Sequence, residues 1–169
     1  HSVSVTTRKP RKGEIEGVDY YFTDNSNFEK MIEAQEILEY DKYCDFYYGT
    51  PKAPLLEFMD KGIDVIMDIT VPGSLSVMEK FPEAVSVFLL PPSFTELKRR
   101  LFKRGTESQE AQKKRLEKAY YEISMTERFE YVLVNDNIEE TAKSIIAITK
   151  AEKFRYKRLK GIEDAVISN

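Results

Sequence analysis

Two arginines near the start of the chain could bind a phosphate group. Arg8 and Arg11 stand on either side of Pro10, a residue that favours a turn. A guanidinium group pairs with phosphate oxygens through two parallel hydrogen bonds, so two arginines at one turn can converge on a single anion. The same stretch offers further groups for such a cluster: Ser4, Glu14 and Tyr20. By itself the pattern is weak, because two isolated arginines at this spacing more often form a solvated basic surface.

Residues 39–50 contain side chains that could recognise a purine base. The carboxylate of Glu39 can accept hydrogen bonds from both N1–H and N2–H of guanine, a donor pair that adenine lacks. The hydroxyls of Tyr48 and Thr50 could complete the contacts to phosphate and base. In the alternative interpretation, Tyr47 and Tyr48 are strand aromatics that pack on the core, and Glu39 lies on the surface.

The first fifty residues predict a small β-rich module around these side chains. Residues 2–7 alternate small polar and β-branched side chains, and residues 18–22 are apolar and aromatic, as in short strands. Asp24 is a candidate N-cap for a helix, and the aromatic-rich residues 39–48 predict another strand.

The rest of the chain predicts an α/β core with a parallel sheet. Three apolar runs predict buried strands: residues 63–69, 84–90 and 131–134. Helices are predicted at four places: from Thr50, and over residues 75–80, 93–102 and 138–154. Strands that alternate with helices indicate a parallel sheet, and the run 63–69 suits a strand buried on both faces. Residues 98–118 are rich in charge and predict an exposed, movable element.

Composition excludes several classes of site. A hydrophobic content of 41% over 169 residues suits a single domain, and a net charge of −3 gives no case for binding nucleic acid or a membrane surface. The single cysteine, Cys44, and the single histidine, His1, provide neither an internal disulfide nor a zinc-binding set. This usage predicts a cytoplasmic protein.

The order and spacing of five sequence blocks resemble the guanylate kinase family. The pattern S-V-S-x-T-T-R-x-P-R-x-G-E-x-x-G-x-D-Y-x-F spans residues 2–22. Four further blocks follow in register: Tyr47-Tyr48-Gly49-Thr50, Pro91-Pro92-Ser93, Arg104-Gly105-Thr106-Glu107 and Val134-Asn135-Asp136. The resemblance extends from residue 2 to about residue 154.

The resemblance implies an α/β fold in which helices flank a P-loop-kinase-like parallel sheet. One domain over residues 1–169 would contain a small β-rich GMP-binding subdomain, a core, a helical lid and a tail, at residues 4–50, 51–97 with 129–156, 98–128 and 157–169. The implied reaction transfers a phosphoryl group from ATP to GMP and yields ADP and GDP, with Mg²⁺ bridging phosphates.

The family pattern also implies a role for individual residues. Guanine would be held by Ser4, Glu39 and Thr50. The GMP phosphate would be held by Arg8, Arg11, Tyr20 and Tyr48, with Glu14 as a member of the same cluster. The lid arginines that stabilise charge on the transferred group would be Arg100, Arg104 and Arg115. The adenine side of the ATP site would be bordered by Asn135 and Asp136.

The sequence departs from the family pattern at two places. The phosphate-binding loop G-x-x-x-x-G-K-[ST] does not occur in the 169 residues, and the family places it before residues 2–8. We expect the chain to be part of a complete kinase rather than a protein that has lost ATP binding, because the parallel sheet would otherwise lack a central strand. At the second place, Asp68 keeps the family's aspartate near the metal, but Thr70 replaces a GMP-binding aspartate and Pro72 replaces glutamine. We expect Thr70 to retain a weaker contact to GMP.

A non-catalytic scaffold module is the alternative function. Such a guanylate-kinase-like domain would bind phosphopeptides through the same basic turn, and the missing loop and Thr70 would fit it. Retention of Ser4, Glu39 and Thr50, which would contact guanine, favours the enzyme.

Overall fold

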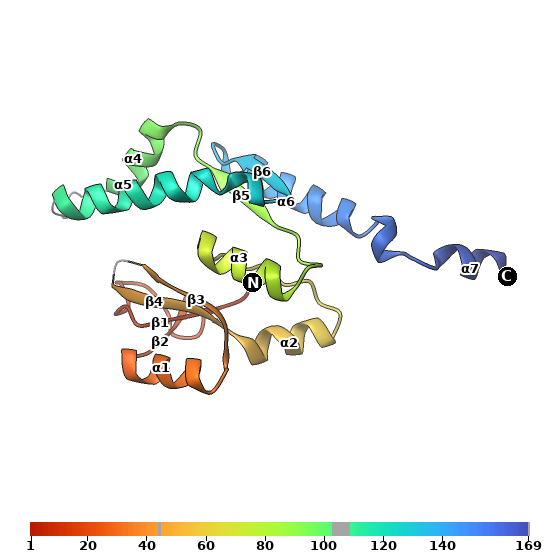
Figure 1. The fold of residues 1–169 in the computed structure, drawn as a ribbon, viewed down its shortest axis with the longest axis horizontal. Coiled ribbons are helices and arrows are strands. Elements are labelled where there is room, and N and C mark those ends of the chain that lie inside the picture. Colours follow the sequence, from red (N-terminus) through yellow and green to blue (C-terminus); the bar gives the residue numbers. More distant parts are fainter. Residues whose placement is uncertain (44, 103–108, 169) are drawn as a thin grey trace. The chain divides into compact units, whose positions relative to one another are not determined.

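The computed structural model describes residues 1–43, 45–102 and 109–168 (Figure 1). The chain forms two compact units, His1–Ala84 and Val85–Asn169. Among the described residues, no helix combines the length and the apolar character needed to cross a membrane.

The first unit is built on a four-stranded mixed sheet with the order β2-β1-β4-β3. Its strands are β1 (Ser4–Thr6), β2 (Tyr20–Phe22), β3 (Ile37–Tyr43) and β4 (Phe46–Pro51). Strand β1 runs parallel to β2 and antiparallel to β4, which in turn pairs antiparallel with β3. The region 39–48, predicted to be one strand, is therefore a hairpin, and Asp45 makes its turn with φ of 67°.

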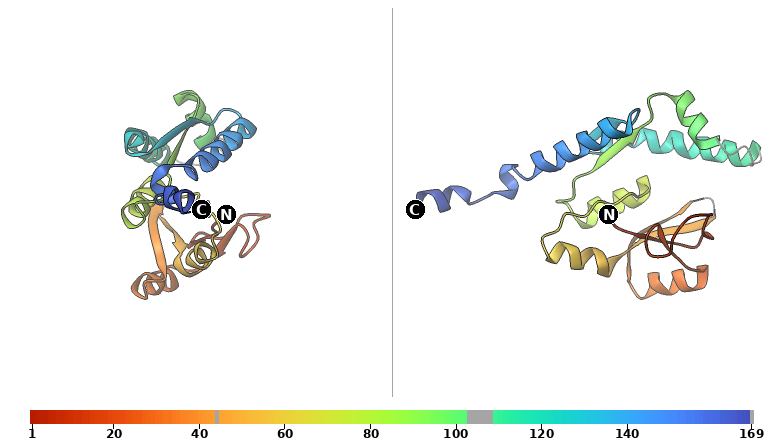
Figure 2. Two further views of the ribbon diagram at one scale, coloured as in Figure 1. Left: turned by 90° about the vertical axis from the view of Figure 1, so that its right-hand side faces the viewer. Right: turned by 180° about the vertical axis from the view of Figure 1, so that it is seen from behind.

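Three helices belong to this unit: α1 (Asn25–Glu33), α2 (Lys52–Asp60) and α3 (Val71–Lys80). The predicted cap at Asp24 is confirmed, because its carboxylate accepts a hydrogen bond of 2.8 Å from the Asn27 backbone N–H. Thr70 caps α3 in the same way. Helices α1 and α3 lie on opposite sides of the sheet (Figures 1 and 2).

The hydrophobic core of this unit contains two groups of side chains. Under α1, Phe28 is fully buried and stacks on Tyr47 with 4.9 Å between ring centroids. Beside α2 and α3, the buried side chains of Leu38, Leu55 and Val77 form a cluster. These groups attach the helices to the β3–β4 hairpin.

The prediction of a strand over residues 63–69, buried on both faces, is wrong. The segment forms no strand. Its Ile66 carbonyl accepts a backbone hydrogen bond from Ser2 N–H, and at its start Ile63 N–H donates to the Phe58 carbonyl of α2. Val65 and Met67 pack against the Leu38 cluster, whereas Ile66 is 59% exposed. The run is therefore extended and covered on one face, because a strand needs a neighbouring ladder that these two hydrogen bonds do not supply.

The second unit contains a two-stranded parallel sheet of β5 (Val87–Leu90) and β6 (Tyr131–Val134), in which Val87 pairs with Tyr131. The predicted strand 131–134 is confirmed, and the strand predicted over 84–90 begins later. The unit's helices are α4 (Phe94–Phe102), α5 (Gln109–Ser124), α6 (Ile138–Glu152) and α7 (Ile162–Ile167), with short 3₁₀ turns η1 (Thr126–Arg128) and η2 (Tyr156–Arg158). Helix α7 lies within the segment predicted to be a tail.

Polar side chains join the segments of the second unit. The backbone N–H of Ser86 donates to the Glu130 carboxylate, and the Glu130 N–H donates to the Ser86 hydroxyl. The hydroxyl of Tyr131 donates to buried Glu152 at 2.5 Å, and Arg155 donates to the same carboxylate. The end of α6 is thus anchored to β6.

We expect Phe28→Ala to destabilise the first unit by about 3–5 kcal/mol, because it removes a fully buried aromatic ring and leaves a cavity. Urea unfolding followed by circular dichroism would measure the change. The matched control is Phe58→Ala. Because Phe58 is 44% exposed, this change should lower the free energy of unfolding much less. Equal losses from both variants would contradict the described core.

Candidate active site

The pairing of the strands gathers five of the predicted residues on one face of the first sheet. Ser4 pairs with Tyr20, and Glu39 pairs with Thr50. Tyr48 lies two residues before Thr50 on β4 and therefore points to the same face. The rings of Tyr20 and Tyr48 approach to 6.1 Å between centroids. The register thus groups residues that lie far apart in the sequence.

Glu39 presents a buried carboxylate on this face. It is 4% exposed, and its Oε1 accepts a hydrogen bond of 2.6 Å from the hydroxyl of fully buried Thr50. Burial raises the pKa of Glu39, an effect that the Thr50 hydrogen bond and the charge of Lys80 partly oppose. The alternative of a surface glutamate is therefore wrong for this residue.

Arg8 and Glu14 form a two-fold ion pair near the same face. Arg8 Nη1 and Nη2 each donate to a different carboxylate oxygen of Glu14 at 2.9 Å. The pairing raises the pKa of Arg8 and lowers that of Glu14. Among the residues that the structure describes, nothing accepts a hydrogen bond from the buried Nε–H of Arg8. Glu14 thus orients a guanidinium group that keeps one buried donor for another acceptor.

Aromatic rings complete the surroundings of Arg8, and Asp68 acts on one of them. Its guanidinium carbon lies 5.2 Å from the centroid of the Tyr20 ring. Burial is the main cause that raises the pKa of Tyr20. Tyr48 and the negative charge of Asp68 raise it further, and the positive charge of Arg8 opposes them. Asp68, predicted to lie near the metal, is therefore close enough to act on this cluster.

Arg11 and Thr70 are placed differently from Arg8. The Arg11 backbone N–H donates to Glu14 at 2.6 Å, and its side chain, which is 53% exposed, forms only a loose ion pair with Glu14, with 3.8 Å between Nη1 and Oε1. The hydroxyl of Thr70 accepts a hydrogen bond of 3.4 Å from the Gly73 N–H at the start of α3. Thr70 therefore has a structural role, and its predicted contact to GMP stays a prediction.

In the second unit, a carboxylate that sequence reasoning missed holds Arg100. Glu96 accepts from Arg100 Nε at 2.7 Å and from Arg99, and these two arginines lower the pKa of Glu96 to about 2. Arg100 also donates to the Asn135 carbonyl at 3.1 Å. The structure thus brings a predicted lid arginine to a predicted residue of the adenine side. The sequence did contain a signal for this pair, because Glu96 precedes Arg100 by four residues within a predicted helix.

The structure describes two of the three other residues predicted for this unit. Arg115 is on α5, Asp136 is in the loop between β6 and α6, and Arg104 lies outside the described residues. The Asn135 side-chain oxygen accepts a hydrogen bond of 3.2 Å from Thr141. This bond fixes the loop that follows β6.

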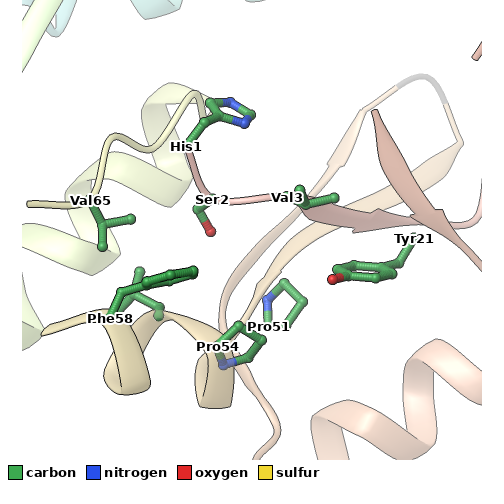
Figure 3. A pocket seen from close by; sticks show the side chains of 9 residues that line it. His1, Ser2, Val3, Tyr21, Pro51, Pro54, Phe58 and Val65 are labelled. Atoms are coloured by element: carbon green, nitrogen blue, oxygen red, sulfur yellow. The ribbon is translucent and has the colours of Figure 1, made fainter. Parts of the chain in front are cut away.

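A pocket of about 190 Å³ opens elsewhere on the first unit (Figure 3). Apolar side chains line much of it, among them Val3, Phe58 and Val65. The described residues that line it include none of those predicted to contact nucleotides. The candidate site is therefore the polar sheet face and not this pocket.

Comparison with known proteins decides the family. The guanylate kinase family model matches residues 1–152. The chain belongs to the guanylate kinase family. A guanylate kinase from Thermus thermophilus is 48% identical over 159 residues, which cover 94% of this chain and 72% of that protein. A guanylate kinase from Prochlorococcus marinus is 49% identical over 147 residues, which cover 87% of this chain and 80% of that protein.

A solved structure supports the same assignment. The guanylate kinase from Anaplasma phagocytophilum superimposes with a TM-score of 0.85 and 40% identity, covering 99% of this chain and 83% of that one. The predicted fold class, a P-loop-kinase-like α/β fold, is confirmed by this guanylate kinase likeness.

We expect Glu39→Gln to stabilise this guanylate kinase against urea at pH 8. Because burial raises the pKa of folded Glu39 above its ordinary value of 4.5, ionisation costs stability above the folded pKa. The advantage of the variant should shrink as the pH falls toward 4.5, where the carboxyl takes up a proton. The control is Glu33→Gln on an exposed residue of α1. A gain in stability that does not change with pH would contradict the description of Glu39 as a buried carboxylate with a raised pKa.

Proposed function

We propose that the sheet face around Glu39 is the GMP site of an enzyme that transfers a phosphoryl group from ATP to GMP, giving ADP and GDP. The observation that supports this site best is the buried Glu39 carboxylate. Its Oε1 is held by Thr50, so the group has a defined direction and keeps acceptor capacity for the N1–H and N2–H of guanine. Ser4, on the same face, would contribute a further polar contact to the base.

The Arg8 cluster would bind the phosphate of GMP. Its buried Nε–H lacks an acceptor among the described residues, and Glu14 holds the guanidinium plane in one orientation. The hydroxyls of Tyr20 and Tyr48 and the exposed side chain of Arg11 would donate to the remaining phosphate oxygens. A positioned acceptor phosphate is the main requirement of phosphoryl transfer.

The residues of the second unit would serve ATP and the transferred group. Arg100, oriented by Glu96, would place positive charge on the phosphoryl group, together with Arg104 and Arg115. Asn135 and Asp136 would border the adenine. Closure of residues 98–128 over the substrates stays a prediction.

Magnesium would accompany ATP, neutralising charge on its phosphates. Among the described residues, no group of three or more His, Cys, Asp or Glu side chains could hold a metal ion. Asp68 provides a single carboxylate, and this fits Mg²⁺, which is commonly bound by one or two carboxylates and otherwise by phosphates and water.

The scaffold alternative is not supported. The relatives that match over most of the chain are named guanylate kinases. A cytoplasmic location stays a prediction from the single cysteine.

The first test of the function is the binding of GMP and AMP by calorimetry, with Glu39→Gln as the variant. We expect the wild-type chain to prefer GMP. The amide should weaken GMP binding about 10- to 100-fold, because it cannot accept both guanine hydrogens, with a much smaller effect on AMP. Unchanged GMP affinity in the variant would refute the role of Glu39, and tight binding of a phosphoserine peptide without GMP binding would favour the scaffold.

A second test addresses the phosphate side. Arg8→Lys keeps the positive charge but loses the fork that pairs with Glu14 and the Nε–H donor, so GMP affinity should fall about tenfold. The preference for GMP over AMP should stay the same, because both ligands carry the phosphate. Lys9→Arg, on the exposed neighbouring side chain, is the control. A change in base preference with Arg8→Lys would contradict the division of roles.

A further inference from the structure

Gly73 occupies the first turn of α3 without a backbone reason for glycine. It is buried, follows the Thr70 cap, and is not one of the described glycines with a left-handed φ, which are Gly13, Gly17, Gly62 and Gly161. Within a helix, glycine is less favourable than alanine because it loses more backbone freedom on folding. The conformation of α3 therefore does not explain this residue.

The space around position 73 explains why the residue there is a glycine. A Cβ atom at this position would lie 2.2 Å from Glu39 Oε2 and 3.1 Å from the Glu39 carboxyl carbon. Both distances are shorter than van der Waals contact, and the first is far too short for two non-bonded atoms. The missing side chain leaves the room that the second carboxylate oxygen of Glu39 occupies.

Neither the Glu39 side chain nor helix α3 can shift easily to make room for a side chain at position 73. The other oxygen of Glu39 accepts the 2.6 Å hydrogen bond from Thr50, and the glutamate is almost fully buried. Helix α3 is attached to β3 at two later positions on the face that carries Gly73. Val77 packs in the cluster with Leu38, and Lys80 Nζ donates to the Leu38 carbonyl. A side chain at position 73 would therefore act on the carboxylate rather than push the helix away.

We propose that Gly73 is a positioning residue for guanine recognition: its lack of a side chain lets the Glu39 carboxylate lie between Thr50 and the first turn of α3, in the orientation that accepts both guanine hydrogens. The proposal rests on the proposed role of Glu39 in the GMP site. It assigns to α3, outside the β-rich module, a part in selecting the base.

The test is calorimetry of the full chain with GMP and with IMP, which lacks the 2-amino group. We expect Gly73→Ala to weaken GMP binding about tenfold or more and to reduce the preference for GMP over IMP, because the displaced carboxylate loses one of its two hydrogen bonds to guanine. Ser74→Ala, the neighbouring change on the same helix, should leave both affinities unchanged. An equal loss for GMP and IMP would indicate only a disturbed site and would overturn the proposal.

A double-mutant cycle with Glu39→Ala separates this proposal from the GMP site itself. In the Glu39→Ala background the clash is gone, so Gly73→Ala should raise the urea midpoint, as expected for alanine in a helix. In the wild-type background it should lower the midpoint or leave it unchanged. If Glu39→Gln weakens GMP binding but Gly73→Ala does not, the proposal fails while the GMP site stands. If Glu39→Gln has no effect on GMP, the GMP site fails, whatever the cycle shows.

Discussion

The candidate site of this guanylate kinase is arranged around one buried carboxylate. Removing Glu39 from water raises its pKa, and a site that keeps such a group must hold it by hydrogen bonds. One oxygen is held by Thr50 across the β3–β4 hairpin, and the other lies against the first turn of α3 at Gly73. The register of the hairpin, the cap of α3 and the packing of Val77 all serve to keep this arrangement in place. A rigid, dry acceptor is also what discrimination between purine bases requires, because an unpaired buried group penalises the wrong ligand.

Arg8 and Arg100 are held differently from the Glu39 carboxylate. Arg8 and Arg100 are each oriented by a glutamate on the same segment, Glu14 and Glu96. An arginine side chain has many rotamers, so a carboxylate that already holds the guanidinium group in place reduces the entropy lost when the group meets a phosphate. Each glutamate also offsets the positive charge of the arginine that it holds. In both units a nearby glutamate thus orients an arginine, and among the described residues Arg8 keeps a buried Nε–H that has no acceptor.

The sequence predicted much of the fold, and it singled out residues that the strand register brings to one face of the first sheet. Local patterns were sufficient for strand 131–134, the cap at Asp24 and the helix that follows strand 131–134, since these depend on neighbouring residues. The run 63–69 was predicted wrongly, because its apolar character indicates burial but not which neighbour supplies the hydrogen bonds. The hairpin between β3 and β4 was read as a single strand, since aromatic residues continue through both of its arms.

The residue types and their order were sufficient to predict membership of the guanylate kinase family, and they led to the proposals of a guanine-binding carboxylate at Glu39 and a phosphate-binding arginine at Arg8. Tertiary structure alone decided how these groups are held. The contact between Glu39 and Gly73 joins residues far apart in the sequence, on a strand and a helix, and no local pattern encodes it. The ion pair of Arg8 with Glu14 likewise depends on the path of a turn. Sequence determines which chemistry a side chain can perform, whereas its pKa, direction and free hydrogen-bonding groups follow from burial and neighbours that exist only once the chain has folded.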